Sequence, residues 1–197
     1  MNEQMQKVRG QPARRKEIID SARALAAEEG WPAVTLRAIA ARIGCSAPAI
    51  YQYFQDKDAL LSALAATGRE EMNRALETAA TGDHGPAKRL RAMLRALWDF
   101  SIDNRELFAV MVGIDGLAAH RDAAAGALAP AALTRAAAEL LSKHDGHESP
   151  QDLADRLFAT ANGFIGLAAG GAFPEGVEQA SELFARTIDA LLKDIRR

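Results

Sequence analysis

The stretch TLRAIAARIGCSAPAIYQYFQDK, residues 35–57, decides the fold of the N-terminal part of this chain. Its first apolar residues recur at helical spacing and predict a short helix with one buried face: Leu36, Ile39, Ala40 and Ile43. Thr35 stands before this helix, where it favours an N-cap. Gly44 follows the helix, where a left-handed residue is needed to end it.

A second short helix is predicted directly after this turn. Ser46 can cap it, and Pro48 is tolerated in its first turn because the amide that proline lacks would have no partner there. Ile50 and Phe54 lie four residues apart on its inner face. Two helices around a tight turn are typical of a DNA-binding helix-turn-helix, which we place at about 35–54.

The outer face of the second helix begins with small residues, and hydrogen-bonding side chains follow them. The small residues can contact thymine methyl groups, and Gln52 can form a bidentate pair with adenine. Arg37 and Arg42 could contact phosphates or simply be solvated, and Arg37 is the better candidate. Asp56 can cap the next helix, whose N-terminus at Lys57 suits a phosphate. The residues predicted to contact DNA are Thr35, Arg37, Ser46, Ala47, Pro48, Ala49, Tyr51, Gln52, Tyr53 and Lys57.

Residues 14–64 resemble the DNA-binding domain of the TetR family of bacterial transcriptional regulators. IIDSARALAAEEGWPAVT, at 18–35, is similar to the family's first helix and its glycine-ended turn. GCSAPAIYQYFQDKDALL, at 44–61, is similar to the stretch that follows. The chain departs from the family pattern at Cys45, where Val is usual, and at Ala38, where an acidic capping partner is common. The resemblance implies a C-terminal body that binds a small-molecule effector and forms a dimer through its last two long helices.

The composition predicts an all-α protein, because alanine is abundant, Val, Ile and Thr are sparse, and no segment alternates with a period of two. We expect a flexible arm at 1–12, a three-helix helix-turn-helix DNA-binding domain at 13–64 and a helical effector-binding and dimerisation domain at 65–197. The first domain is predicted to contain helices at 13–29 and 57–80. Those of the body are predicted at 87–103, 104–118, 121–143, 151–171 and 176–195.

The charge is distributed unevenly. Residues 1–57 contain nine Lys or Arg and six Asp or Glu, a balance of +3, so the rest of the chain, with 15 and 20, has −5. A modestly basic end on an acidic body suits local phosphate contact, although chance can also produce such a difference. The N-terminus is polar, and the longest apolar stretch, 163–173, is too short to span a bilayer. We therefore expect a cytoplasmic protein without a membrane partner.

The body contains two candidate sites. Met and aromatic residues suit an adaptable apolar effector pocket, but at helical spacing they could equally be core. The predicted pocket residues are Met93, Leu97, Trp98, Phe100, Phe108, Met111, Asn162 and Phe164. Small residues on one helical stripe allow a second helix to approach closely, which suggests a dimer interface. A monomer core is the alternative, and it is less favoured because an operator reader of this type needs two half-sites. The predicted interface residues are Ala159, Gly163, Gly166, Gly170, Phe184, Ile188 and Leu191.

We expect a homodimeric repressor that binds a palindromic operator in double-stranded DNA and is released by an unidentified small-molecule effector. The alternatives are a transcriptional activator or a DNA-binding dimer without an effector. An all-helical enzyme is the least favoured class, because the sequence contains no Glu-x-x-His pair, phosphate loop or recognisable triad. No cofactor is predicted, and no metal, since His144 and His147 have spacing that matches no closed site.

Overall fold

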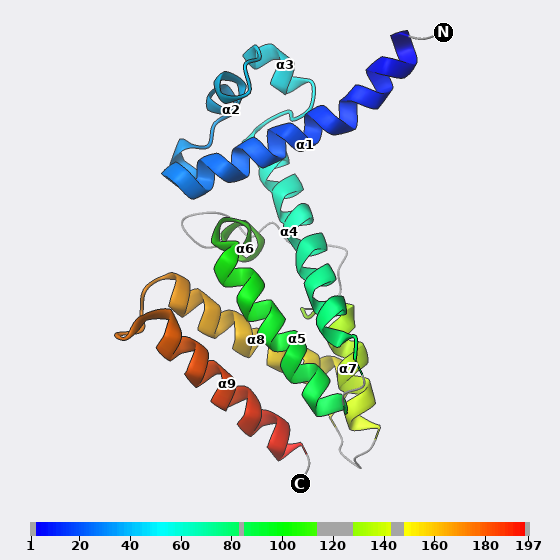
Figure 1. Ribbon diagram of the computed structural model, residues 1–197, viewed down its shortest axis with the longest axis vertical. Helices are drawn as coiled ribbons and strands as arrows, with labels where there is room; N and C mark the ends of the chain where they lie inside the picture. The colour runs from blue at the N-terminus through cyan, green and yellow to red at the C-terminus, as the bar shows by residue number, and fades with distance from the viewer. Residues whose placement is uncertain (1–2, 83–84, 114–127, 143–147, 196–197) are drawn as a thin grey trace. The chain divides into compact units, whose positions relative to one another are not determined.

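The computed structural model describes residues 3–82, 85–113, 128–142 and 148–195. Within these ranges every regular element is a helix, which confirms the all-α prediction (Figure 1). Contacts divide the described residues into two compact units. The N-terminal unit comprises 3–68 and 105–113, and the body unit comprises 69–104 and the described residues from 128 onward.

The N-terminal unit is a small helical cluster in which α1 packs against η1, α2 and α6, and α2 packs against α3. Its elements are α1 (Glu3–Glu29), η1 (Trp31–Ala33), α2 (Leu36–Arg42), α3 (Ala47–Tyr51), the first part of α4 (Lys57–Ala80) and α6 (Arg105–Val112). Ile18, Ala22, Val34, Ile39 and Leu64 are fully buried at its centre. Four of them, Ile18, Ala22, Ile39 and Leu64, are apolar positions of predicted helices, so their helical spacing is explained by burial. Val34 lies at the end of η1.

Helix α1 begins at Glu3, ten residues before the predicted start at 13. Pro12, the last residue of the predicted arm, lies inside α1. A proline removes one backbone hydrogen bond without always ending a helix, and residues 3–9 consist mainly of Glu, Gln, Met, Lys and Arg, which favour helix. The predicted mobility of 1–12 remains a prediction.

Helix α6 belongs to the N-terminal unit by its contacts, although it follows α5 in the chain. The Arg23 guanidinium of α1 bonds the Glu106 carboxylate of α6 at 2.8 Å. A Cβ added at Gly68 of α4 would lie only 2.7 Å from Met111 Sδ and 3.3 Å from Leu107 Cβ. A side chain at position 68 would therefore displace the Met111 side chain, so Gly68 favours the close approach of α4 and α6. The expected boundary between 64 and 65 separates α6 from the helices it contacts.

The body unit contains α5 (Pro86–Asp103), α7 (Ala131–Leu141), α8 (Pro150–Ala169), α9 (Gly176–Asp194) and the second part of α4. Helices α5, α7 and α8 pack against one another, and α9 packs against α5 and α8 (Figure 1). The rings of Trp98 on α5 and Phe184 on α9 stack with centroids 5.2 Å apart. Arg91 and Asp189 form an ion pair between the same two helices.

Two predicted helices of the body are shorter in the structure. The helix expected at 104–118 is α6, which ends at Val112 before Gly113, whose φ of 76° is left-handed. The helix expected at 121–143 begins at Ala131 in α7, because Pro130 occupies the N-cap and has no amide to donate. Residues 121–127 lie outside the described part of the chain. None of the described helices has both the length and the apolar character needed to cross a membrane.

Candidate functional site

The turn between α2 and α3 is built from local capping interactions. Thr35 Oγ1 accepts a hydrogen bond from the Ala38 amide at 3.0 Å, which caps α2. Gly44 follows with a φ of 66°, and the Cys45 amide donates to the Ala40 carbonyl at 2.9 Å. Asp56 Oδ1 accepts from the Ala59 amide at 2.7 Å at the start of α4. These bonds confirm the predicted capping roles of Thr35, Gly44 and Asp56.

Ser46 occupies the N-cap position of α3, but its hydroxyl makes no capping bond, which corrects the prediction. A capping serine accepts from the second or third amide of its helix. Pro48 is the second residue and has no amide, and the Ala49 amide donates to the Ser46 carbonyl at 3.0 Å. The exposed hydroxyl therefore remains available to a group outside the chain.

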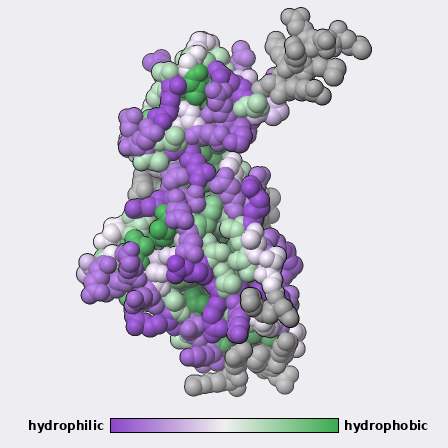
Figure 2. All heavy atoms as spheres, viewed as in Figure 1, coloured by the Kyte–Doolittle hydropathy of each residue, from purple (hydrophilic) through white to green (hydrophobic). Residues whose placement is uncertain are grey.

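The outer face of α3 is exposed along its length. Ser46, Pro48, Tyr51 and Gln52 are exposed, and Tyr51 has 53% of its surface accessible. Ala47, Ala49 and Tyr53 are half-buried, whereas Ile50 and Phe54 are buried in the N-terminal unit. Helix α3 ends at Tyr51, so Gln52 and Tyr53 lie in the turn that follows and not within the helix. Hydrophilic residues predominate on the face of this unit that Figure 2 shows.

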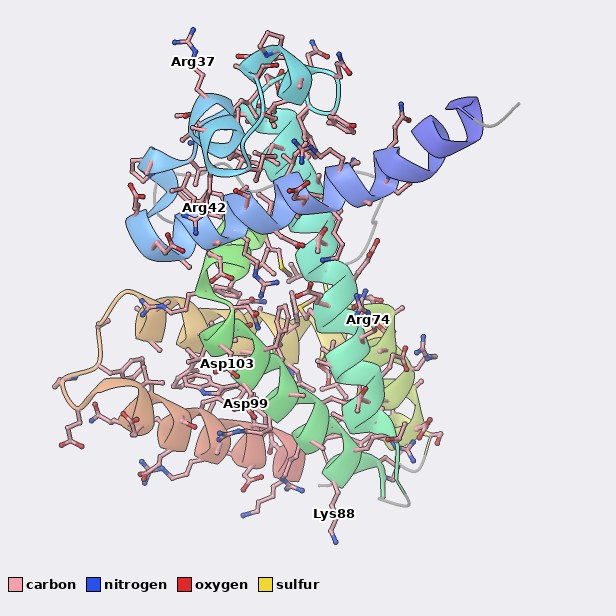
Figure 3. All side chains as sticks on the ribbon, turned by 45° about the horizontal axis from the view of Figure 1, so that its top comes forward. Arg37, Arg42, Arg74, Lys88, Asp99 and Asp103 are labelled. Carbon is pink, nitrogen blue, oxygen red and sulfur yellow. The ribbon has the colours of Figure 1, made fainter. Side chains whose placement is uncertain are left out.

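Two arginines of α2 lie in different environments. Arg42 donates from both terminal nitrogens to the two carboxylate oxygens of Glu28, at 2.7 and 2.5 Å. These hydrogen bonds lower the pKa of the Glu28 carboxyl and raise that of Arg42. Arg37 is exposed, points away from the helix and forms no ion pair with any residue that the structure describes (Figure 3). Arg37 is thus the α2 arginine that is free to bind an anion.

Lys57 is held by a bond that the sequence did not predict. Its Nζ donates to the Trp31 carbonyl at 2.9 Å, and its side chain is half-buried. An ammonium has three N–H donors, so this bond leaves others for a phosphate. Lys57 therefore connects the start of α4 to η1 and also remains a candidate phosphate ligand.

The structure also contains a cleft in the body unit, between α5 and α9, with a volume of about 380 Å³. Its lining is Arg95, Trp98, Asp99, Ile102, Asp103, Val177, Glu178, Ser181 and Glu182. Figure 3 shows Asp99 and Asp103 on the same helix, α5. Trp98 is the only predicted pocket residue among them. The missed signal was a pair of acidic residues one helical turn apart on each of the two helices.

The remaining predicted pocket residues do not form one site. Phe108 and Met111 are buried in the N-terminal unit, whereas the others lie in the body unit. Met93 and Leu97 are completely buried core residues, and Phe100 and Phe164 are half-buried. Asn162 Nδ2 donates to the Phe158 carbonyl at 2.9 Å, and its buried Oδ1 has no partner among the described residues.

The predicted interface residues separate into an open stripe and a buried set. Ala159, Gly163 and Gly170 are exposed on α8, Gly166 is half-buried, and neighbouring Leu167 has 55% of its surface exposed. A Cβ added at Gly163 or Gly166 would meet no described atom within 4 Å. On α9, Phe184 and Ile188 are each 3% exposed in the core, and Leu191 is half-buried. Phe184 and Ile188 therefore offer almost no surface to a partner.

The described residues contain no group of three or more His, Cys, Asp or Glu side chains that could hold a metal ion. His144 and His147 lie outside the described part of the chain.

The sequence matches two family profiles that together cover both parts of the structure. Residues 18–64 match the bacterial regulatory proteins of the tetR family, and residues 90–191 match the tetracyclin repressor-like C-terminal domain. The first match contains α2, α3 and the capping residues of the turn. The second contains most of α5 and all of α7 and α8.

Individual relatives agree with these profiles. The chain is 38% identical over 99 residues to the HTH-type transcriptional regulator BetI of Serratia proteamaculans, over 49% of this chain and 50% of that protein. It is 47% identical over 60 residues to an HTH-type transcriptional repressor of Mycobacterium tuberculosis, over 30% of this chain and 32% of the other. The chain thus matches about half or less of the length of these curated relatives.

A solved structure of a protein of unknown function from Rhodococcus sp. RHA1 has a similar fold over nearly the whole chain. The two share 28% sequence identity with a TM-score of 0.75, covering 93% of this chain and 95% of the other. The similarity therefore includes the body unit as well as the helix-turn-helix. Because the two profiles together match most of the chain, it belongs to the TetR family of bacterial regulatory proteins.

Proposed function

We propose that this protein is a homodimeric transcriptional repressor that binds a palindromic operator through α2 and α3 and is released by a small-molecule effector. The observation that carries the proposal is the exposed polar face of the helix-turn-helix. This face carries side chains that form no hydrogen bond or ion pair with any described residue: those of Arg37, Ser46, Tyr51 and Gln52. The names of the curated relatives, a transcriptional regulator and a repressor, support the same function.

The proposed DNA contacts divide into two kinds. Thr35, Arg37, Tyr51, Tyr53 and Lys57 would hold phosphates, which position the protein without selecting a sequence. Base contacts would come from Ala47, Pro48 and Gln52. The alanine and the proline can contact only apolar groups such as the thymine methyl. Most of the sequence preference would then depend on Gln52 and on DNA shape.

Dimer formation is proposed because a regulator of this type contacts two half-sites about one helical turn of DNA apart. The open stripe of α8 suits a second copy of the same stripe. Its glycines leave space for the backbone of a partner helix, and Leu167 supplies exposed apolar surface beside them. An interface between identical surfaces would place α8 against α8 around a twofold axis.

Effector control is proposed to act through α4, whose residues belong to both units. The dimer would exist in states that differ in the spacing of its two DNA-binding units. An effector that binds more tightly to a state whose spacing does not match the operator would shift the population toward that state. The affinity for DNA would fall by the same factor by which bound DNA lowers the affinity for the effector, since coupling between the DNA site and the effector site is reciprocal.

The proposal is tested by gel shift with the intergenic DNA upstream of the gene, compared with a shuffled fragment of equal length. Specific retardation at physiological salt supports it, and equal retardation of both fragments contradicts it. Transcription from the same DNA in vitro then distinguishes a repressor from an activator.

Arg37→Ala is expected to weaken binding to every DNA sequence by a similar factor. The loss of one phosphate contact should reduce the slope of log K against log salt concentration by about 0.9. Arg42→Ala is the matched control on the same helix, because Arg42 is occupied by Glu28. Fluorescence anisotropy over a salt series measures both slopes. An equal change in the two variants would show that Arg37 is not the contacting arginine.

Gln52→Ala is expected to relax sequence preference with little change in non-specific binding. A good bidentate contact discriminates against a wrong base by about 1–3 kcal/mol. Binding of both proteins to a library of operators with one base pair changed measures the preference at each position. If the variant retains the full preference at every position, Gln52 contacts no base.

A further inference from the structure

The cleft between α5 and α9 has an unusual distribution of charge. Each wall carries two carboxylates one helical turn apart, Asp99 and Asp103 on α5 and Glu178 and Glu182 on α9. The lining contains four carboxylates and one guanidinium, that of Arg95, so it has three net negative charges. The cleft therefore has the charge to attract a cation.

Most of this charge is not compensated by any residue that the structure describes. Arg95 pairs with Asp99 at 2.9 Å and donates to Ser181 Oγ at 2.9 Å. Asp103, Glu178 and Glu182 form no ion pair with any residue that the structure describes. Like charges one turn apart repel each other, and Asp103 also ends α5, where the helix dipole is negative. A bound cation would remove both unfavourable interactions.

The separation of the carboxylates indicates what kind of cation fits. They do not converge on one point, since no metal-holding group of three occurs among the described residues. The cleft has a volume of about 380 Å³, within the range of organic-ligand pockets. Apolar side chains, Ile102 on α5 and Val177 on α9, line it together with the carboxylates. Separated charges and apolar surface within one cleft match a flexible alkyl chain that carries several ammonium groups.

We propose that this cleft binds a linear alkyl polyamine. Its ammonium groups would pair with Asp103, Glu178 and Glu182, and its methylene groups would cover Ile102 and Val177. Arg95 would stay on Asp99 and Ser181 and close one side of the cleft. This inference rests on the proposed function, because it assigns a ligand class to the effector-responsive body, but binding itself can be measured without DNA.

The test is calorimetric titration of the full-length protein with spermidine at about 150 mM NaCl, which suppresses loose surface association. We expect one saturable site per chain. Asp103→Asn combined with Glu182→Gln should weaken binding by about tenfold or more. The matched control, Glu70→Gln combined with Asp194→Asn, removes the same charge from exposed positions outside the cleft and should bind as the wild type does. Magnesium chloride at equal ionic strength should not displace spermidine.

Three results would overturn the site: no saturable binding by the wild type, equal weakening in the control, or displacement by magnesium. The link to regulation is separate. Gel shifts compare the wild type with the cleft variant at one spermidine concentration. Spermidine that binds the DNA affects both proteins equally, so a difference between them comes from the cleft. Release of the wild type alone supports the effector role. Specific operator binding without calorimetric spermidine binding refutes the cleft assignment and leaves the proposed repressor intact.

Discussion

Leu167→Glu is expected to convert the proposed dimer into monomers and to lower operator affinity by about 10²–10⁴-fold. Two linked DNA-binding units gain an avidity of this size over one, and the gain disappears when the link is lost. Leu167 is 55% exposed in the protomer, so glutamate there should disturb the protomer little. In the dimer, the new carboxylates would be buried beside the α8 stripe of the partner, and burying an unpaired charge is costly.

The control for this prediction is Leu128→Glu, which makes the same substitution at another exposed leucine of the body unit, 39% accessible. It should leave both the dimer and the operator affinity unchanged. Analytical ultracentrifugation measures the oligomeric state, and gel shift with the full palindrome and with a single half-site measures affinity. A Leu167→Glu protein that remains dimeric would exclude the α8 stripe as the interface.

Phe108→Ala is expected to destabilise the protein by about 3–5 kcal/mol, the usual range for removing a buried phenylalanine. Phe108 is 2% exposed and lies on α6, among the core residues of the N-terminal unit. Phe108 was also predicted to line an effector pocket. In that case its truncation would only enlarge an existing cavity, and the loss of stability would be much smaller.

Urea unfolding followed by circular dichroism measures this loss, and Phe100→Ala provides the comparison. Phe100 is half-buried on α5, so its truncation should cost distinctly less. Because the chain has two units, tryptophan fluorescence should accompany the measurement: Trp31 lies in the N-terminal unit and Trp98 in the body. Equal losses in the two variants would place Phe108 outside the core.

The features predicted correctly from the sequence are local ones. Thr35, Gly44 and Asp56 act within three or four residues of their own positions, so the order of residue types was sufficient. The same local logic placed Ser46 correctly at the N-cap but wrongly predicted a bond from its hydroxyl, because Pro48 has no amide and the Ala49 amide donates to the Ser46 carbonyl. Pro12 shows a second limit: a proline favours a helix boundary, but α1 continues through it to Glu3 because the residues before it favour helix.

The features that were missed depend on contacts between residues distant in sequence. Lys57 bonds Trp31 across 26 residues, and the cleft combines α5 with α9. Helical periodicity shows that a residue is buried but not which helix buries it. Phe108 and Trp98 have the same apolar character, yet one belongs to the N-terminal unit and the other lines the cleft.

The assignment of α6 to the N-terminal unit has a consequence for protein engineering. DNA-binding heads are most simply exchanged between related regulators by cutting the chain once, after the helix-turn-helix. Here one crossover near residue 68 would transfer Gly68 and Arg23 without the α6 residues they contact, Met111 and Glu106. A functional hybrid of this protein should therefore need two crossovers, so that α6 and the head are inherited from the same parent.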